Sequence, residues 1–388
     1  MCIRDRYGIS LVDLSTGEFT ASEFTGDSGR QTVLDELSIL APKEIIQSDR
    51  FVIRDDLPEL SSLQTQFTKI DAHHFTEDQA HSLLCEHLEV ASLNGSSLYG
   101  HPAAISACGA LVHDLTNTQK VELNHLRSIS FQMHVDHVLI DSTTFRHLEI
   151  LSSTDGDKRR SLLAELDSTS TPMGARLLRS WLQRPLNKKE LIQNRLDAVE
   201  ELAFLTMERL KLKDLLSSVH DLERLTARIV LGSASPRDLV ALAKSIRMIP
   251  EIKQILQECK SPLLISLLSE LDELRDVREN IEQTIVDEPP LLIRDGGAIR
   301  GGFNTELDDC RSLSSNAKDA ISSMEKTEKE RTGISSLKIR YNRVFGYFIE
   351  ISKSNLHLIP DDYHRKQTIA NGERFITCLL YTSDAADE

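Results

Sequence analysis

The sequence contains no long hydrophobic run. No stretch approaches the roughly 18 to 20 consecutive apolar residues that a helix needs to cross a bilayer. The opening residues, MCIRDR, lack the apolar segment of a secretory signal peptide. We therefore expect a soluble globular protein of the cytoplasm, without membrane contact. With 388 residues, 40% of them hydrophobic, the chain is long enough for two or three domains.

The sequence also lacks the cysteine patterns of zinc sites. Its six cysteines are scattered, with no Cys-x-x-Cys pair and no histidine grouping at zinc-ligand spacing. His73 and His74 are adjacent, but no second ligand pair follows one helical turn away. We expect ordinary reduced thiols and no metal site. The cysteines are Cys2, Cys85, Cys108, Cys259, Cys310 and Cys378.

Positive charge is scarce in the chain as a whole. There are 45 Lys and Arg residues against 60 Asp and Glu residues, which gives a net charge of −15. Non-specific nucleic-acid binding comes from neutralised phosphates, so this balance excludes a protein that coats nucleic acid with its whole surface. Any DNA contact has to be local.

The first part of the chain has the pattern of a small α/β domain that ends near residue 125. Residues 7–25 alternate apolar with small or polar types around Ser-Thr-Gly at 15–17, which predicts a hairpin. A helix is expected over 29–41, a strand over 44–47 and a second helix over 77–93. Strands and helices therefore alternate.

The middle of the chain has long segments of helical period with clear start signals. Thr171 is placed to cap a helix, Pro172 falls at its first position and Pro185 stops it. Asp221 and Ser235-Pro236 open two more helices in the same way. The apolar face predicted for the first of these helices consists of Met173, Leu177, Leu178, Trp181 and Leu182.

A long, exposed helix is expected from Thr305 onward. Apolar or small residues recur there with 3,4 spacing, which describes a weak seam. The seam consists of Leu307, Cys310, Ser314, Ala317, Ile321 and Met324. The period then changes to two in two strands. Their alternating residues are Leu337, Ile339 and Tyr341, followed by Phe345, Tyr347, Ile349 and Ile351.

The segment 334–377 is basic although the chain is acidic. It carries seven Lys or Arg residues against four Asp or Glu residues. A locally basic, β-rich arm on an acidic protein indicates a polyanion partner. The aromatic residues of this arm would stack bases in a single-strand binder, but their alternation favours core packing of a small sheet.

Several strings of this chain, taken in order, closely resemble the MutS family of DNA mismatch-repair proteins. The resemblance extends over most of residues 7–377. ERTG, GYFIEIS and HRKQTIANGERFIT resemble the family's clamp and the helix end before it. The other strings are LVDLSTGEF, TPMGARLLRSWLQRPL, DLERLTARIVLGSASPRDLVAL and IRDGGAIRGGFNTELDDCRSL.

The resemblance implies a multidomain α+β fold. It comprises an RNase H-like α/β connector, a mostly α-helical core with a long lever helix, and a small β-rich clamp. The implied bounds are 7–125 for the connector, 126–333 for core and lever, and 334–377 for the clamp. We interpret 1–6 and 378–388 as non-native ends, because both look foreign to the chain between them.

The family's clamp closes over the DNA backbone away from the mismatch, and this implies a set of DNA-binding residues. Basic and amide side chains at β turns reach phosphate oxygens without reading sequence. The implied contacts are Lys353, Asn355, Arg365, Lys366, Gln367 and Asn371. Many bacterial relatives have Lys where this chain has Ala370, which removes one expected phosphate contact.

Two defining parts of the family are not found. There is no Phe-x-Glu mismatch-reading motif ahead of the connector and no Gly-x-x-x-x-Gly-Lys-Ser/Thr phosphate loop. The glycines at 296, 297, 301 and 302 are followed by no Lys-Ser/Thr, so we expect a turn there. We therefore expect a fragment without enzyme activity, catalytic residues or cofactor of its own, whereas the parent is expected to be a DNA-dependent ATPase using ATP and Mg.

The expected partners are double-stranded DNA, bound non-specifically through its backbone, and other mismatch-repair proteins, bound through connector and core. The parent is expected to be a homodimer and the fragment a monomer, in a bacterial cytoplasm and associated with the nucleoid in use.

Three other interpretations stay open. The basic residues of the clamp also fit a solvated strand face. An RNase H-like domain hosts a two-metal nuclease in other proteins, and Asp13 lies on the first strand, although a carboxylate beside a Ser-Thr-Gly turn also bonds turn amides. A helical adaptor would bind only proteins, through residues 150–330. Mg²⁺-dependent cleavage, salt-sensitive duplex binding and binding to protein alone separate these interpretations.

Overall fold

The computed structural model describes residues 6–26, 28–50, 65–120, 123–133, 136–342, 346–369 and 371–377, with 313–320 and 342 described by their backbone alone. The chain divides into two compact units, one ending at Ile299 and the other beginning at Arg300. This division does not coincide with either of the domain boundaries predicted near residues 125 and 333, and those boundaries stay predictions. Of the ends interpreted as non-native, only Arg6 is described, and it pairs with Thr25 in the first strands.

The first unit opens with the predicted hairpin. Strands β1 (Arg6–Asp13) and β2 (Glu18–Thr25) are antiparallel, and the short β5 (Ser130–Phe131) runs parallel to β2. Gly17 has a φ of +80° and donates its N–H to the Asp13 carbonyl at 2.9 Å. The left-handed backbone of this turn favours glycine, which confirms the predicted turn.

Helices cover both faces of this hairpin. On one side, α1 (Gly29–Leu40) buries Val33, Leu34 and Leu37 in a cluster that Ile9 also contacts. On the other side, α3 (Glu77–His87) and α4 (Pro102–Gln119) pack against β2. Two parallel strands, β3 (Glu44–Ser48) and β4 (Gln66–Ile70), form a second sheet. The predicted elements at 29–41 and 44–47 are confirmed.

The helix predicted over 77–93 is shorter than expected. It ends at His87, and Glu89 adopts a left-handed φ of +56°. The chain turns there, so Leu93, only 1% exposed, enters the core from a non-helical segment. Its apolar character reflects tertiary burial, which periodicity alone misread as helix.

Helix α4 was not predicted. Its sequence, PAAISACGALVHDLTNTQ, is rich in small residues, and these permit close approach to its neighbours. A Cβ on Gly8 of β1 would lie 2.0 Å from the Ala103 carbonyl oxygen, and one on Gly109 would lie 2.4 Å from Ala80 Cβ. Small side chains on several faces weaken the helical period that identifies other helices.

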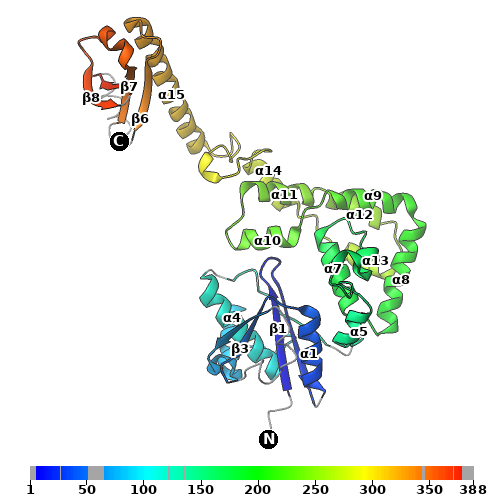
Figure 1. Cartoon of the computed structure of the whole chain (residues 1–388). Helices are drawn as coiled ribbons and strands as arrows, with labels where there is room; N and C mark the ends of the chain where they lie inside the picture. The colour runs from blue at the N-terminus through cyan, green and yellow to red at the C-terminus, as the bar shows by residue number, and fades with distance from the viewer. Residues whose placement is uncertain are drawn as a thin grey trace. The chain divides into compact units, whose positions relative to one another are not determined.

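The rest of the first unit is a helical domain, drawn in green and yellow in Figure 1. The helices predicted from caps are confirmed. Thr171 Oγ1 accepts the Gly174 N–H at 3.0 Å, Asp221 accepts the Arg224 N–H at 3.3 Å, and Ser235 forms a capping box with Asp238. The helices are α5 (Ser142–His147), α6 (Leu162–Leu166), α7 (Pro172–Gln183), α8 (Lys189–Phe204), α9 (Thr206–Ser217), α10 (Leu222–Val230), α11 (Pro236–Ile246), α12 (Ile249–Leu256), α13 (Pro262–Glu270) and α14 (Arg275–Thr284).

The apolar face of α7 is not a buried one. Leu177 is 52% exposed and Trp181 is 37% exposed, and the Arg195 guanidinium lies 3.6 Å from the centre of the Trp181 ring.

Beyond α14 a single turn (Ile293–Asp295) precedes Gly296 and Gly297, both with positive φ, which confirms a turn at this position. No helix in the described part of the chain is long and apolar enough to cross a membrane.

The second unit consists of the predicted long helix and a four-stranded sheet. Helix α15 (Thr305–Thr332) begins at the Asn304 cap and ends at Gly333, whose φ is +69°. The sheet has the order β6-β7-β9-β8. Its elements are β6 (Lys338–Asn342), β7 (Gly346–Ser352), the 3₁₀ segment η7 (Lys353–Leu358), β8 (His364–Ile369) and β9 (Gly372–Ile376).

The end of α15 and the sheet share one core. Met324 packs against the cluster that contains Ile349, Ile351 and Phe375, so one predicted seam residue belongs to the sheet's core. Two hydrogen bonds also connect the end of α15 to the sheet. Glu325 accepts the Ile339 N–H at 3.0 Å, and Tyr363 donates its hydroxyl to Glu328 at 2.6 Å.

Candidate nucleic-acid interface

One face of the four-stranded sheet, which we call the clamp sheet after the predicted clamp, carries Lys338, Arg340 and Arg374. The register pairs Lys338 with Glu350, Arg340 with Phe348, and Glu350 with Arg374. Directly opposed side chains of an antiparallel pair lie on the same face. These residues therefore share the face opposite to the apolar core.

Arg374 is held in place by the protein itself. Its guanidinium lies 4.5 Å from the centre of the Phe348 ring, and Nη1 donates to Gln367 Oε1 at 2.8 Å. Its Nε is 3.7 Å from a Glu350 carboxylate oxygen. This arginine is stacked, hydrogen-bonded and neutralised, so it stabilises the sheet.

Two of the predicted DNA-binding residues also have partners within the sheet. Arg365 forms an ion pair with Glu373, with Nη1 and Oε1 at 3.4 Å. Gln367 accepts the hydrogen bond from Arg374 through its side-chain oxygen. Both residues belong to β8, an edge strand. An arginine next to a carboxylate releases fewer counterions from DNA than a free one does.

Lys366 lies in an irregularity of this edge strand. Arg365 pairs with Phe375 and Gln367 with Arg374, so Lys366 is an extra residue of a β-bulge. Bulges redirect a side chain and interrupt the ladder. The Lys366 side chain is exposed.

Lys353 and Asn371 come together at one end of the sheet. The Lys353 N–H donates to the Asn371 carbonyl at 3.2 Å, which joins the end of β7 to the β8–β9 turn. Both side chains are exposed. The prediction for Ala370 lies outside the described residues.

Asn355 organises a group of hydroxyls at the same end. Its side-chain nitrogen donates to Ser336 Oγ at 2.9 Å and approaches Ser352 Oγ at 3.4 Å. Ser352 Oγ is 3.1 Å from Ser354 Oγ. Sequence reasoning missed these serines, although the string Ser-Lys-Ser-Asn after a strand of alternating period was a visible signal.

Three exposed cations differ from the paired arginines. Arg340, Lys353 and Lys366 are exposed, and none has an ion pair within the described residues of the clamp. Arg340 comes from one edge strand, Lys366 from the other and Lys353 from the start of η7, directly after a central strand. The site residues stay predictions, and these three cations are exposed to solvent, as a residue that contacts phosphate has to be.

The aromatic residues divide between core and surface. Tyr347 packs against the apolar core, and Phe348 is 3% exposed, so both are at least partly buried, as predicted, although Phe348 lies on the other face beneath Arg374. Tyr341 is 59% exposed, so the core prediction is wrong for this residue. Its ring lies edge-on to Tyr347 at a centroid distance of 5.0 Å. Tyr341 is on an edge strand, where one side has no neighbour to cover it. Phe345 lies outside the described residues.

Asp13 has the structural role that its turn suggested. One carboxylate oxygen accepts the Ser15 N–H at 2.9 Å and the Ser15 hydroxyl at 2.7 Å. Within the described ranges, no group of three or more His, Cys, Asp or Glu residues has the arrangement of a metal site. His74, adjacent to His73, stacks on His113 with a centroid distance of 3.5 Å.

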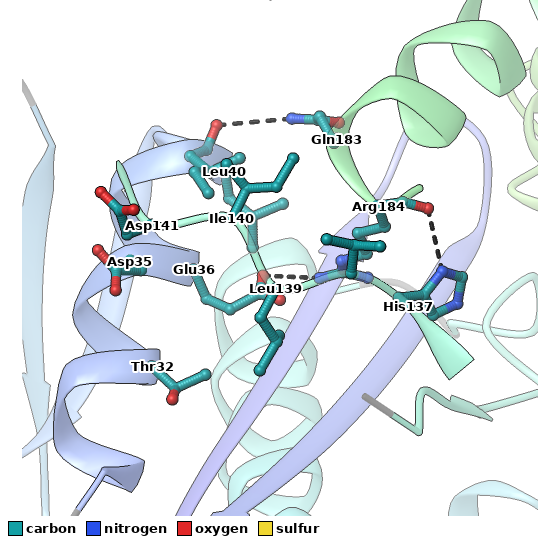
Figure 2. Close-up of a pocket in the computed structure, with 12 residues that line it drawn as sticks. Thr32, Asp35, Glu36, Leu40, His137, Leu139, Ile140, Asp141, Gln183 and Arg184 are labelled. Atoms are coloured by element: carbon teal, nitrogen blue, oxygen red, sulfur yellow. Dashed lines mark hydrogen bonds and ion pairs between the residues drawn. The ribbon is translucent and has the colours of Figure 1, made fainter. Parts of the chain in front are cut away.

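A cavity of about 210 Å³ in the first unit lies between α1, residues 137–141 and the end of α7 (Figure 2). Its charged groups are occupied. Arg184 Nη2 pairs with Glu36 at 2.8 Å, and Asp35 accepts the Ser142 N–H at 3.0 Å. His137 Nδ1 lies 3.0 Å from the Arg184 carbonyl. We call these contacts the α1–α7 joint, because they connect α1, residues 137–142 and the end of α7.

Comparison with known proteins identifies the family. A model of MutS domain III matches residues 143–371, and a model of MutS domain II matches residues 2–127. The chain belongs to the MutS family. Its mostly helical, multidomain α+β fold with small sheets agrees with the predicted fold class.

Individual MutS relatives match along nearly the whole chain. The DNA mismatch repair protein MutS of Symbiobacterium thermophilum is 41% identical over 376 residues, which are 96% of this chain and 43% of that protein. MutS of Solibacter usitatus is 42% identical over 383 residues, with the same coverage of 96% and 43%. MutS of Methanococcoides burtonii is 40% identical, covering 96% of this chain and 42% of that protein. The chain thus spans less than half of each relative.

All six predicted DNA-binding residues lie inside the MutS domain III match, which ends at residue 371. Arg374 lies beyond it. The family match therefore includes the end of the sheet where Lys353, Asn355 and Asn371 meet, and the structure adds the serines that sequence reasoning left out.

Proposed function

We propose that this chain supplies the connector, the signal-transmitting helical core and the DNA clamp of a MutS-type mismatch repair protein. The clamp binds the backbone of double-stranded DNA without reading its sequence. The single observation that carries this proposal is the set of exposed cations on the clamp sheet, Arg340, Lys353 and Lys366, which no carboxylate neutralises within the described residues.

The protein's overall charge makes this local set decisive. A chain of net charge −15 repels a polyanion over most of its surface, so binding has to come from a region where cations exceed carboxylates. In the clamp, Glu350 and Glu373 are each paired with an arginine, and Asp362 is paired with Arg331. Three of the four carboxylates of residues 334–377 are therefore paired, and Asp361 has no ion pair among the described residues. The side chains of Arg340, Lys353 and Lys366 remain for phosphates, whereas Lys338, also exposed, lies opposite Glu350 in the strand register.

The test is duplex binding by the full chain, measured by fluorescence anisotropy over a salt series. With three phosphate contacts, the log of the binding constant should fall against the log of salt with a slope of about −2.7, at about −0.9 per contact. Changing Arg340, Lys353 and Lys366 together to Ala should abolish most of that slope. A homoduplex and a duplex with one mismatch should bind equally.

Two results would overturn the proposal. One is the absence of binding at low salt by a chain whose circular dichroism spectrum shows it folded. The other is binding by the triple variant with an unchanged slope. A preference for the mismatched duplex would contradict the assignment of backbone contact alone.

The chain is assigned no enzymatic reaction and no cofactor of its own in this proposal. The full-length parent is proposed to be an ATPase that uses ATP and Mg. We further propose a monomer for this chain and a homodimer for the parent, in a bacterial cytoplasm and acting at the nucleoid.

A second candidate function is binding of partner proteins through the helical domain, and one observation favours it. Helices α8 and α9 expose several large apolar side chains, and a group of such side chains on the surface of a protein is typical of an interaction site. These are Leu196 at 55%, Val199 at 64%, Phe204 at 80%, Met207 at 63% and Leu210 at 56%. Other mismatch-repair proteins are the proposed partners of this surface and of the connector. Full DNA binding by a variant with these five residues changed to Ser would assign the two functions to separate surfaces.

A further inference from the structure

We infer that the end of the clamp sheet forms a seat for one backbone phosphodiester of duplex DNA, made by Lys353 together with the hydroxyls of Ser336, Ser352 and Ser354. The inference rests on the proposed DNA-binding function and adds to it the groups that hold one phosphate. We call these four residues the phosphate seat. Asn355, predicted as a DNA contact, acts instead as the residue that positions the seat.

Three separate segments bring these side chains together. Ser336 precedes β6, Ser352 ends β7, and Ser354 lies in the following 3₁₀ segment. Ser336 Oγ and Ser352 Oγ are 3.4 Å apart, and Ser352 Oγ and Ser354 Oγ are 3.1 Å apart. The exposure of Ser336, Lys353 and Ser354 leaves the group accessible to a ligand as large as a DNA backbone.

The three hydroxyls of the seat have more O–H donors than the contacts among them use. The amide nitrogen of Asn355 points both its N–H groups at serine oxygens, at 2.9 Å to Ser336 and 3.4 Å to Ser352. Those oxygens thus act as acceptors for the amide. Two contacts join the three hydroxyls and use two O–H donors at most, so at least one O–H is unassigned, and the contact at 3.4 Å is weak.

Charge selects the ligand. Lys353 lies between Ser352 and Ser354 in the chain and has no ion pair within the described residues. The nearest carboxylate in sequence, Glu350, is occupied by Arg374 at 3.7 Å. Three hydroxyls grouped by hydrogen-bond contacts, with an exposed lysine in the chain between two of them, are complementary to an anion with several oxygens. Serine hydroxyls, lysines and amides are the groups that contact DNA phosphates in proteins generally.

The edge of the seat is fixed by backbone contact. The Lys353 N–H donates to the Asn371 carbonyl at 3.2 Å, and a Cβ on Gly372 would lie 2.3 Å from the Ile351 carbonyl oxygen. The β8–β9 turn is therefore held tightly against the end of β7. The backbone that carries Ser352 and Lys353 is thus fixed by the sheet, and this lowers the cost of ordering the seat on binding.

The experiment compares the salt dependence of duplex binding for wild type and three variants, each made in the whole 388-residue chain. In the double variant Ser352→Ala/Ser354→Ala, affinity should fall about tenfold, because about one hydrogen bond to a charged group is lost. Its salt slope should stay at the wild-type value, because serine releases no counterions. Lys353→Ala should weaken binding and also reduce the slope by about 0.9. Ser335→Ala, an exposed neighbour with no hydrogen bond among the described contacts, should bind as the wild type does.

Other variants separate loss of the seat from loss of folding. Ser354→Thr keeps the hydroxyl and should bind within about twofold of wild type. Asn355→Asp keeps the shape but removes both N–H donors and adds a negative charge, so it should bind more weakly than the double serine variant. Equal thermal unfolding midpoints across the set establish that the sheet is intact.

The outcomes distinguish the seat from the proposed function. Wild-type affinity in the double serine variant would overturn the seat and leave the clamp's DNA binding standing, provided that Lys353→Ala still lowers the slope. No salt-dependent binding by the wild type would overturn both. Replacing sodium chloride by sodium phosphate at constant ionic strength tests the source of the phosphate. A larger loss for wild type than for the double variant would support the seat, because free phosphate competes with a DNA phosphate only where DNA occupies the site; an equal loss in both would overturn the assignment to DNA.

Discussion

The α1–α7 joint and the clamp sheet use the same types of charged residue for different purposes. In the joint, Arg184 meets Glu36 at 2.8 Å, and their side chains are only 20% and 12% exposed. In the clamp, Arg340, Lys353 and Lys366 are exposed and lack ion pairs within the described residues. The difference teaches that a cation's role depends on whether the fold brings a carboxylate to it. Basic residue type alone does not distinguish cohesion from binding.

The clamp contains both situations side by side. Arg365 and Lys366 are adjacent on one edge strand, yet Arg365 has Glu373 at 3.4 Å, whereas Lys366 occupies a bulge and has no ion pair with any described residue. Arg365 is 63% exposed whereas Glu373 is 16% exposed, and an ion pair that is open to solvent on the arginine side contributes little to stability, roughly 0 to 1 kcal/mol. Its effect is on DNA affinity, through the charge that it cancels.

The largest expected effect is on the joint. Changing Glu36 to Ala leaves the Arg184 guanidinium largely buried without its carboxylate, and we expect a loss of about 3 kcal/mol in unfolding free energy. Urea denaturation followed by circular dichroism measures this. DNA affinity and its salt slope should be unchanged.

The matched control for this substitution is Glu86→Ala. Glu86 is an exposed carboxylate on α3 of the same unit, and we expect a change within about 0.5 kcal/mol. An equal loss in both variants would show that the Arg184 contact adds nothing to the cohesion of the joint.

An intermediate effect is expected where helix α15 meets the clamp. The hydrogen bond from Lys329, and then that from the Ile339 N–H, hold the pKa of Glu325 below its ordinary value of 4.5. Because the folded pKa is depressed, this stabilisation is complete above pH 4.5 and is lost as the pH falls through the folded pKa. At neutral pH, the unfolding free energy of wild type should exceed that of Glu325→Gln by about 1 to 2 kcal/mol.

Thermal unfolding of both chains over a descending pH series measures that difference. The two curves should converge at the acid end, because the protonated carboxyl resembles the amide. Glu330→Gln, an exposed change on the same helix, should follow wild type at every pH. A gap between wild type and Glu325→Gln that persists in acid would contradict the assigned cause.

The smallest expected effect converts a paired arginine of the clamp into a free one. Glu373→Gln removes the carboxylate beside Arg365, and duplex affinity at low salt should rise about threefold to tenfold, with the salt slope steeper by up to about 0.9. Anisotropy over the same salt series measures this. In the wild-type background, Arg365→Ala should change affinity by less than about twofold, because its charge is already cancelled. A stronger loss in Arg365→Ala than in Lys366→Ala would reverse the comparison.

Local signals predicted much of the fold, and long-range packing accounts for the errors. The caps at Thr171, Asp221 and Ser235 act within three residues of chain, so they could be identified without any tertiary contact. The end of α3 could not, because Leu93 is apolar for a core that distant segments complete. Tyr341 was misassigned for the same reason, since alternation does not reveal that a strand lies at an edge.

By itself, the sequence determined the alternation of elements in the first domain, the helical middle, the long helix, the β-rich basic arm and the family resemblance, because period, caps and strings are local properties of the chain. Only the tertiary structure decided which cations remain free. Glu373 reaches Arg365 across a strand pair, Glu350 reaches Arg374 across another, and Ser336 meets Asn355 over 19 positions of sequence. Neutralisation and donor clustering depend on distances of a few ångströms between residues far apart in the chain, and periodicity carries no information about those distances.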